Sequence, residues 1–367
     1  MIKLERQDLL NKLNILEKAY TVKNAIPTLT FLKFDNGKLT MSNGDTIIIT
    51  RIEIENENNE DFKALIPFKL LKDIVSKLNG DIISLDNEDN VLKLKCNRSN
   101  YKLCKADFNS YPNISITKLD NVLKINSNDF KMAISSIAFA CSNEEKKPIL
   151  TGANFVLKDN ELNIIATDSF RLAKVNVKNI DSGEFNFTIS KNDLNNLIKI
   201  IPTDIELEIR YDNRNIVFQF DDVLYKTRLL EGIFPNVDKI LNINYSNTIK
   251  FNKNELVDCL NRISIFKSED KTNIAILNCE EDKNDLLISS NEINQIGNAK
   301  ELMTCNNSIS CQSLKMACNC DNLLEALNTF ENSEELNLNY NDSLKPFTIT
   351  SDSEVNLLQL LLPIKVD

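Results

Sequence analysis

The 367-residue sequence contains no histidine and no tryptophan, and it has only seven glycines. Histidine is the usual general base near neutral pH and the commonest metal ligand. Its absence excludes Ser-His-Asp and Cys-His catalytic sites and the common zinc hydrolase sites. The few glycines form neither a G-x-G-x-x-G motif nor a phosphate loop, so no nucleotide-binding cradle is expected.

The sequence also lacks a hydrophobic run long enough to span a membrane. The densest apolar stretch, 357–364, is interrupted by Gln359 and Pro363 and falls short of the ~18–20 residues that a membrane helix needs. The first ten residues are charged and amphipathic, unlike a secretory signal. We therefore expect a cytoplasmic protein with no membrane partner.

Nine cysteines, an odd number without regular spacing, indicate reduced thiols rather than disulfides. Four of them, Cys305, Cys311, Cys318 and Cys320, are close enough in sequence to suggest a metal site. No C-x-x-C pair is present and no histidine could complete the ligand set, so small buried side chains are the favoured interpretation.

Four sequence landmarks recur at intervals of 121 to 129 residues. Each landmark is an alternating apolar segment, a helical pattern or a turn, and the landmarks follow one another in the same order in each copy. The period is far longer than the 20–50 residues of solenoid repeats, so each copy is a domain in its own right. We predict three domains, at residues 1–120, 121–246 and 247–367. The landmarks are 2–13, 123–134 and 249–260; 66–78, 189–201 and 318–330; 39–45, 162–168 and 286–292; and 111–113 with 234–236.

Within the first copy, residues 5–19 and 66–78 show helical spacing of apolar residues. Alternating runs separated by Asn-Gly turns predict strands, which gives an α+β domain with two helices. The predicted strands are 28–34, 38–42, 46–54, 82–85, 91–96 and 101–105.

The whole chain has a net charge of −10, and its predicted helices are less acidic than the remainder. Helices of this kind could face a polyanion while the remaining surface repels nonspecific contacts. Their lysines could equally form ordinary solvated faces, and the charge pattern alone leaves both interpretations open.

Four segments together resemble the bacterial DNA polymerase III β subunits, the DNA sliding clamps. They occur in the family's order and spacing, and the resemblance extends over the whole chain. ATDSFRLA is the most specific of them. The segments are KPILTG at 147–152, ATDSFRLA at 166–173, EGIFPN at 231–236 and LLLPIKV at 360–366.

This resemblance implies an α+β fold of three similar domains, each with two helices packed on curved antiparallel sheets. It further implies a head-to-tail homodimer that forms a six-domain ring around duplex DNA, without sequence specificity. Such a protein is a non-catalytic processivity factor without cofactor or metal. Its partners would be the replicative polymerase, the clamp loader and other proteins that carry a short linear motif.

The resemblance also assigns three sets of site residues. The partner-peptide groove would be formed by Lys147, Leu150, Thr167, Arg171, Leu172, Pro235, Ile240, Asn319, Leu361, Leu362, Pro363 and Ile364, with Lys147 and Arg171 at its rim. For the DNA-facing cations, the resemblance assigns Lys23 before Pro27. Four further cations are expected from helix position alone: Lys69 and Lys77 on the second helix, Lys199 on the fourth and Arg262 on the fifth. The dimer interface would join Tyr101 and Leu103 to Ile265 and Phe266.

Departures from the family pattern concern the groove. Phe170 stands where a histidine is common, and Asn322 where a tyrosine often gates the pocket. Leu362 and Ile364 replace adaptable methionines, so we expect a stiffer pocket.

Two other functions stay open at this point. Asp45, Asp168 and Glu292 recur at similar positions and could be read as the carboxylates of a metal-dependent hydrolase acting on nucleic acid. Equivalent positions in neighbouring domains should however lie too far apart for two-metal chemistry, since a domain of about 100 residues has a radius of gyration of ~13 Å. A repeat-built regulatory binding module is the second alternative. Retention on circular DNA, and loss after the DNA is cut, would distinguish a clamp from both.

Overall fold

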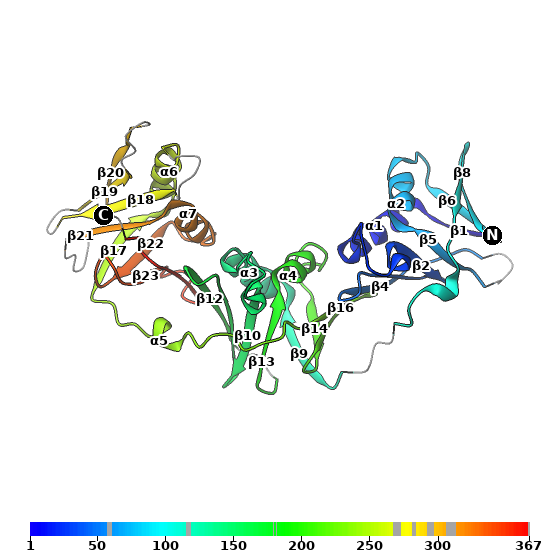
Figure 1. Cartoon of the computed structure of the whole chain (residues 1–367), viewed down its shortest axis with the longest axis horizontal. Helices are drawn as coiled ribbons and strands as arrows, with labels where there is room; N and C mark the ends of the chain where they lie inside the picture. The colour runs from blue at the N-terminus through cyan, green and yellow to red at the C-terminus, as the bar shows by residue number, and fades with distance from the viewer. Residues whose placement is uncertain are drawn as a thin grey trace. The chain divides into compact units, whose positions relative to one another are not determined.

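A computed structural model of the chain describes residues 1–56, 61–114, 119–178, 180, 182–266, 273–280, 284–291, 297–305 and 313–365. It contains two compact units, Met1–Asn128 with Asn196–Leu229, and Asp129–Asn195 with Leu230–Asp367. Each unit has one eight-stranded and one four-stranded sheet, and the strand pairings in the described residues are antiparallel (Figure 1).

Unit 1 holds helices α1 (Arg6–Leu16) and α2 (Phe68–Lys77), which pack against each other and on the larger sheet. Its larger sheet has the order β5 (Lys63–Pro67), β2 (Phe31–Asp35), β3 (Lys38–Ser42), β4 (Ile47–Arg51), β16 (Val223–Arg228), β15 (Asn215–Phe220), β14 (Glu206–Tyr211), β9 (Asn121–Asn126). Its smaller sheet has the order β1 (Ile2–Glu5), β6 (Ile82–Glu88), β7 (Val91–Cys96), β8 (Ser99–Cys104). Short 3-10 turns are η1 (Glu17–Ala19), η2 (Pro27–Thr30) and η3 (Phe108–Ser110).

Unit 2 follows the same plan. Its larger sheet has the order β13 (Phe185–Ser190), β10 (Gly152–Lys158), β11 (Glu161–Thr167), β12 (Arg171–Lys178), β24 (Leu357–Leu361), β23 (Phe347–Thr350), β22 (Glu335–Tyr340), β17 (Asn247–Asn252). Its smaller sheet has the order β20 (Lys300–Thr304), β19 (Asp285–Ser290), β18 (Ile274–Cys279), β21 (Leu314–Asn319). The helical segments are α3 (Ser127–Ile137) and α4 (Lys191–Leu197), two residues of each of which belong to unit 1, then η4 (Ala138–Ala140), η5 (Pro148–Thr151), α5 (Asp238–Leu241), α6 (Lys253–Ile263) and α7 (Cys320–Asn328).

The larger sheets join strands from consecutive repeats of the sequence. In unit 1, β4 of the first repeat pairs with β16 of the second, with Ile47 opposite Lys226. In unit 2, β12 of the second repeat pairs with β24 of the third, with Leu172 opposite Leu360. The compact units therefore do not follow the sequence repeats, and the boundaries near 120 and 246 stay a prediction.

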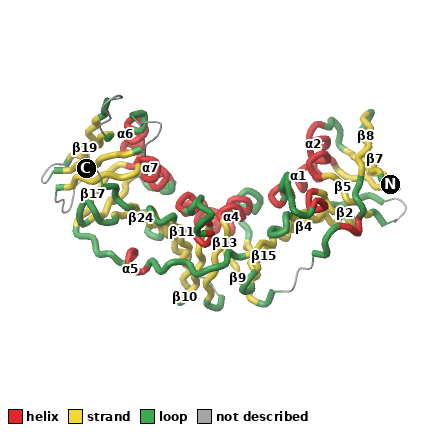
Figure 2. The backbone as a smooth tube through the Cα atoms, viewed as in Figure 1, coloured by secondary structure: helices red, strands yellow, loops and turns green. Residues whose placement is uncertain are grey.

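Helix formation follows the apolar spacing in the sequence. Phe68, Leu71 and Val75 of α2 are buried at intervals of three and four residues, which directs one face of the helix into the core. The Asn252 side chain caps α6 by accepting a hydrogen bond from the Glu255 amide at 3.1 Å. Figure 2 shows strands forming the body of each unit, with helices beside them. The expected α+β class is confirmed.

Several element boundaries differ from the sequence prediction. Residues Lys63–Pro67 form strand β5, so the second helix begins at Phe68 rather than Ile66. Residues Pro27–Thr30 form a 3-10 turn rather than the start of a strand, because Pro27 fixes φ in the helical region. Helix α4 ends at Leu197 and not at 201, because the chain tightens into a turn at 198–200, where the Ile200 amide donates to the Leu197 carbonyl.

Among the described residues, no helix has the length and apolar character needed to cross a membrane.

Candidate functional site

The segment 166–173 forms a tight turn between β11 and β12. The Asp168 carboxylate accepts hydrogen bonds from the amides of Phe170 at 2.8 Å and Arg171 at 3.0 Å. The buried Thr167 hydroxyl donates to the Arg171 carbonyl at 2.6 Å and accepts from the Ser169 amide at 3.1 Å. Ser169 takes a positive φ of 81°. The polar residues of this motif therefore fix the turn.

The Arg171 side chain connects this turn to two helical segments. Its Nε donates to Asp168 at 3.0 Å, and its Nη2 donates to the Phe139 carbonyl of η4 at 2.9 Å. A further nitrogen pairs with Glu325 of α7, and the guanidinium lies 4.9 Å from the centre of the Phe139 ring. Only 10% of the side chain is exposed. Its charge is thus already paired within the chain, so its effect on a ligand at the rim would be indirect.

A group of apolar side chains joins β12 and β24 to the segment that precedes β17. We call it the β12–β24 cluster. It consists of buried Ile165, Leu172, Val237 and Leu360, with Phe234, Leu241 and Leu358 packed against it. Of these seven residues, only Leu172 was predicted from the sequence.

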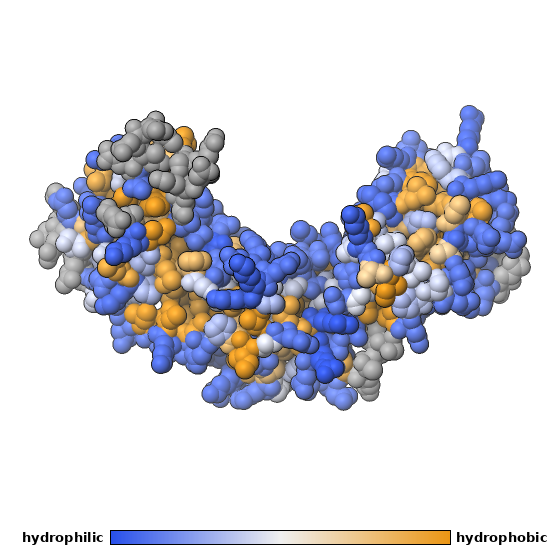
Figure 3. Space-filling model, viewed as in Figure 1, coloured by the Kyte–Doolittle hydropathy of each residue, from blue (hydrophilic) through white to orange (hydrophobic). Residues whose placement is uncertain are grey.

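Large apolar side chains are exposed next to the β12–β24 cluster. Phe170 is 68% exposed, Ile233 93%, Ile240 39% and Leu362 36%, and each lies within two residues of a cluster member. The Leu362 amide donates to the Phe170 carbonyl at 3.0 Å, which places these two residues together. Apolar residues also reach the visible surface in Figure 3. Large exposed apolar side chains that adjoin a buried apolar cluster are candidates for a binding site.

The other residues predicted for the groove take different positions. Lys147 is exposed before η5, Leu150 is buried, and Pro235 is exposed. The Asn319 side chain caps α7 by accepting from the Asn322 amide at 3.0 Å, so its oxygen is occupied. Beyond β24, the half-buried residues Pro363 and Ile364 continue the chain, and the Ile364 amide bonds the Ala317 carbonyl at 2.7 Å.

Leu361 does not share the cluster face of β24. Successive strand residues point to opposite faces, so Leu358 and Leu360 share one face and Gln359 and Leu361 the other. The buried Gln359 donates to the Ser136 carbonyl of α3, which identifies its face as the helix side. Alternation along 357–362 was the signal in the sequence. It places Leu358, Leu360 and Leu362 on one face of the strand and Leu361 on the other.

The predicted DNA-facing cations differ in how their charge is used. Lys23, Lys77 and Lys199 are exposed, and none forms an ion pair with the residues that the structure describes. Lys69 pairs with Asp73 at 3.4 Å, and Arg262 pairs with Glu301 at 2.5 Å. The hydrogen bond from Arg262 holds the pKa of Glu301 below its usual value. Lys199 lies in the turn after α4, not on the helix itself.

Of the four predicted interface residues, three are accessible. Ile265 is 74% exposed just beyond α6, Tyr101 on β8 is 37% exposed and Phe266 is partly exposed. Leu103 is only 1% exposed because its position on β8 points into the core of unit 1. An interface at β8 would therefore depend on Tyr101 and the backbone rather than on the Leu103 side chain.

The carboxylates of the alternative hydrolase reading have structural roles. Asp168 fixes the β11–β12 turn, and exposed Asp45 lies 3.4 Å from Arg228. Glu292 and Cys311 are outside the described residues. Within the described part of the chain, no group of three Cys, Asp or Glu side chains could hold a metal ion. Burial raises the pKa of Cys141 to about 12 and also raises that of Cys318, which disfavours nucleophilic thiolates.

Comparisons with known proteins agree with the repeat organisation. Residues 1–115, 124–236 and 238–365 match the family models of the DNA polymerase III beta subunit N-terminal, central and C-terminal domains, respectively. The beta sliding clamp of Streptococcus pneumoniae is 29% identical, over 98% of this chain and 97% of that protein. The beta sliding clamp of Staphylococcus epidermidis is 27% identical, over 99% of this chain and 98% of that protein. The crystal structure of the DNA polymerase sliding clamp from Bacillus subtilis has a similar fold, with a TM-score of 0.93 and 23% identity. The match covers 100% of this chain and 99% of that chain.

Proposed function

The chain belongs to the DNA polymerase III beta subunit family, and we infer that it is a DNA sliding clamp, a processivity factor that encircles duplex DNA and holds the replicative polymerase on it. The observation that carries this inference is the match of all three domain models, in order, along almost the whole chain. A clamp of this kind acts by topology and positioning rather than by catalysis. It needs no cofactor, and it would work in the cytoplasm.

Two open sheet edges support a head-to-tail dimer. Strand β8 pairs only with β7, and β20 pairs only with β19 among the described residues. Unpaired edges are liabilities unless they are covered, and joining β8 to β20 of a second copy would cover both. Two such contacts close a two-fold ring of six domains. Ile265, which follows a helix packed on β20, would then lie beside the joint.

Sliding requires contacts with DNA that are weak and independent of sequence. Exposed lysines such as Lys23, Lys77 and Lys199 can approach phosphates without reading bases. The net charge of −10 disfavours tight binding elsewhere on the protein. Encirclement then keeps the protein on the DNA although its affinity for DNA is low.

The β12–β24 cluster is the proposed site for the polymerase, the clamp loader and other partners. Exposed Phe170, Ile240 and Leu362 offer apolar walls to an extended peptide with leucine or phenylalanine anchors. Lys147 can meet polar groups at the edge of this surface. The paired Arg171 holds the β11–β12 turn, which carries Phe170, through its bonds to Asp168 and the Phe139 carbonyl.

The decisive experiment uses topology. Protein loaded on nicked circular DNA should remain bound through gel filtration at high salt and should be lost after the circle is linearised. Linear DNA blocked at both ends should retain it again. Equal loss from circular and linear DNA would contradict the clamp and favour a binding module that does not encircle DNA.

A second measurement tests the partner site. Leu362→Asp should weaken binding of a dye-labelled leucine- and phenylalanine-containing peptide at least about tenfold, an effect of about 1.4 kcal/mol. The thermal midpoint should not change, because Leu362 is partly exposed. Truncation after Leu360 should abolish binding while the dimer persists. Wild-type affinity in both variants would remove the site from the β12–β24 cluster.

A further inference from the structure

We propose that unit 1 carries a second peptide-binding pocket, at the β4–β16 junction, that selects an acidic segment with an aliphatic anchor. The pocket has a volume of about 290 Å³. Its apolar lining includes Ile26, Leu29, Ile47 and Ile114. This volume is near the lower limit of ~300 Å³ for ligand sites, so it suits one or two side chains rather than a large cofactor.

The turn beside this pocket shares three amide-to-side-chain hydrogen bonds with the β11–β12 turn. Asn43 Oδ1 accepts from the amides of Asp45 at 3.1 Å and Thr46 at 2.8 Å. Ser42 Oγ accepts from the Gly44 amide at 3.1 Å. Asn43 thus takes the role of Asp168, and Ser42 takes the role of Thr167. The sequence alignment of Asp45 with Asp168 is therefore wrong by two residues.

Strand pairing extends this equivalence across the junction. Ser42 is opposite Ile47, as Thr167 is opposite Leu172. Ile47 is in turn opposite Lys226, as Leu172 is opposite Leu360. The cation Lys226 thus occupies the place of the buried Leu360.

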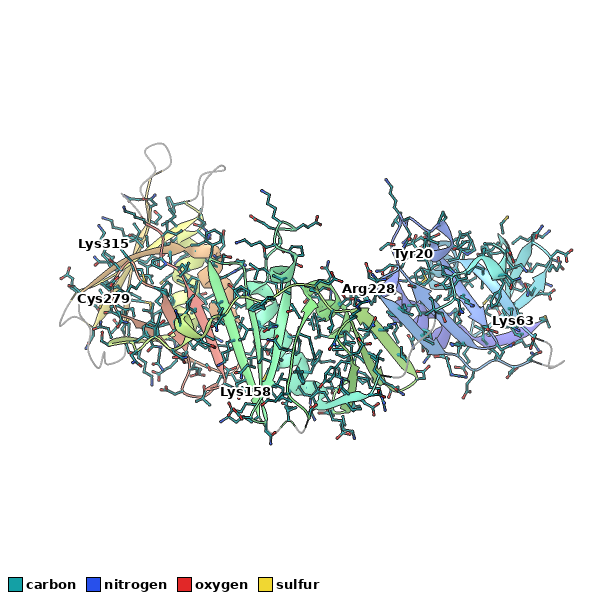
Figure 4. The ribbon with its side chains drawn as sticks, turned by 60° about the horizontal axis from the view of Figure 1, so that its bottom comes forward. Tyr20, Lys63, Lys158, Arg228, Cys279 and Lys315 are labelled. Carbon is teal, nitrogen blue, oxygen red and sulfur yellow. The ribbon has the colours of Figure 1, made fainter. Side chains whose placement is uncertain are left out.

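Two residues further on, Arg228 occupies the place of Leu362. It lies at the end of β16 (Figure 4). Both Lys226 and Arg228 line the pocket.

The charges in the pocket favour an anion. Arg228 lies 3.4 Å from Asp45, but the two side chains are 68% and 74% exposed, so this ion pair is weak and exchanges readily with a ligand carboxylate. Lys226 adds a second positive charge to a lining whose single carboxylate is Asp45, and Asp212, outside the lining, also interacts with Lys226. Such a positive pocket on a chain of net charge −10 is complementary to an acidic segment.

The apolar part of the pocket supplies the anchor site. Leu29 belongs to a buried cluster with Leu65 and Tyr111, against which Ile114 packs. Ile26 is 46% exposed at the edge. The floor takes an aliphatic side chain, while the two cations of β16 take the acidic residue beside it. The occupant is therefore an extended acidic segment of a partner protein, and its binding does not depend on the β12–β24 cluster.

Photocrosslinking of the full-length protein tests this assignment. The probe is a short dye-labelled peptide whose diazirine-leucine anchor is flanked by aspartates, and the matched peptide has lysines in their place. We expect crosslinks from the acidic probe within residues 26–47 or 112–114. Lys226→Glu with Arg228→Glu should weaken this binding at least about tenfold, or about 1.4 kcal/mol. This charge reversal should leave any crosslinks at the β12–β24 cluster unchanged.

The control variant carries Lys158→Glu and Lys178→Glu, the same charge change on exposed strand ends of unit 2, where Lys158 ends β10 (Figure 4). It should bind the acidic probe as the wild type does. Ile26→Asp provides a second variant should the charge reversal impair folding, as judged by thermal melting. Equal binding of both probes, crosslinks confined to unit 2, or a charge reversal without effect would each overturn the proposal.

Discussion

Lys12 of α1 and Asp222 of the β15–β16 turn form an ion pair with an Nζ to Oδ1 distance of 2.7 Å, although they are 210 residues apart in sequence. The same carboxylate accepts hydrogen bonds from the Thr50 hydroxyl and the Arg51 amide, both at 2.8 Å. One side chain of the second repeat thus bonds a helix and a strand of the first.

Replacing Asp222 should loosen the junction between these repeats. Asp222→Ala leaves Lys12 and two hydrogen-bond donors without their acceptor, and we expect a loss of about 2 kcal/mol in the free energy of unfolding. Urea denaturation followed by circular dichroism measures the change. Asp81→Ala, at an exposed position in unit 1, should stay within ~0.5 kcal/mol of the wild type. Equal stability of both variants would mean that the Asp222 contacts contribute nothing net.

The contribution of Asp222 should also depend on pH. Burial raises its pKa, but the hydrogen bonds from Lys12, Arg51 and Thr50 outweigh burial and hold the pKa below the usual 3.8. A carboxyl group whose folded-state pKa is lowered stabilises the protein above its unfolded pKa, and this stabilisation is lost as the pH falls through the folded value. The difference in melting temperature between wild type and Asp222→Asn should therefore be constant near neutral pH and shrink below about pH 4. A difference that does not change with pH would contradict this.

The sequence predicts the local parts of the fold well because they depend on local chemistry. The apolar spacing of α2 and the capping residues of α6 and α7 act over a few residues, and the structure has those helices. The junction strands depend on pairing between distant segments. Nothing within VLYKTR indicates that Lys226 faces Ile47 of another repeat.

The candidate site was only partly predictable for the same reason. The family motifs identify the segments at 166–173 and 231–236, but they do not say which side chains are occupied internally. Arg171 pairs with Asp168 and Glu325, and Asn319 caps α7, so both are committed to structure. The misalignment of Asp45 with Asp168 arose because both turns contain an Asp, whereas the amide-accepting group in the first turn is Asn43.

Gln359 should be important for the stability of unit 2. It is fully buried, and its Nε2 donates to the Ser136 carbonyl at 3.0 Å and the Thr329 hydroxyl at 2.9 Å, which ties β24 to the ends of α3 and α7. We expect Gln359→Ala to cost about 3 kcal/mol, because it leaves a cavity and removes both hydrogen bonds. Gln359→Met fills the volume without the bonds and should cost about half as much. The exposed Gln219→Ala is the control. A Met variant as unstable as the Ala variant would assign the whole effect to the hydrogen bonds.

The unpaired lysines should account for the salt dependence of DNA binding. Replacing Lys23, Lys77 and Lys199 with Gln should reduce the slope of log K against log salt by up to about 3, because each phosphate contact contributes ~0.9. Replacing Lys69 and Arg262 should change the slope less, since those charges are already paired with Asp73 and Glu301. Binding to linear duplexes of different sequence should weaken equally in the triple variant. A larger effect from the paired residues would reverse the assignment.

The final prediction concerns the subunit interface at the end of α6. Ile265 is 74% exposed and follows a helix that packs on the open edge strand β20. Its position beside the open edge of β20, rather than its exposure alone, makes Ile265 a candidate anchor, and truncating a central interface anchor can cost about 2 kcal/mol or more. We expect Ile265→Ala with Phe266→Ala to give folded monomers of 41.8 kDa by gel filtration with light scattering, where the wild type has twice that mass. Leu344→Ala with Val355→Ala removes two other exposed apolar side chains of the same unit and should leave the dimer intact. A double variant at 265 and 266 that stays dimeric at micromolar concentration, with an unchanged melting temperature, would show that the interface lies elsewhere.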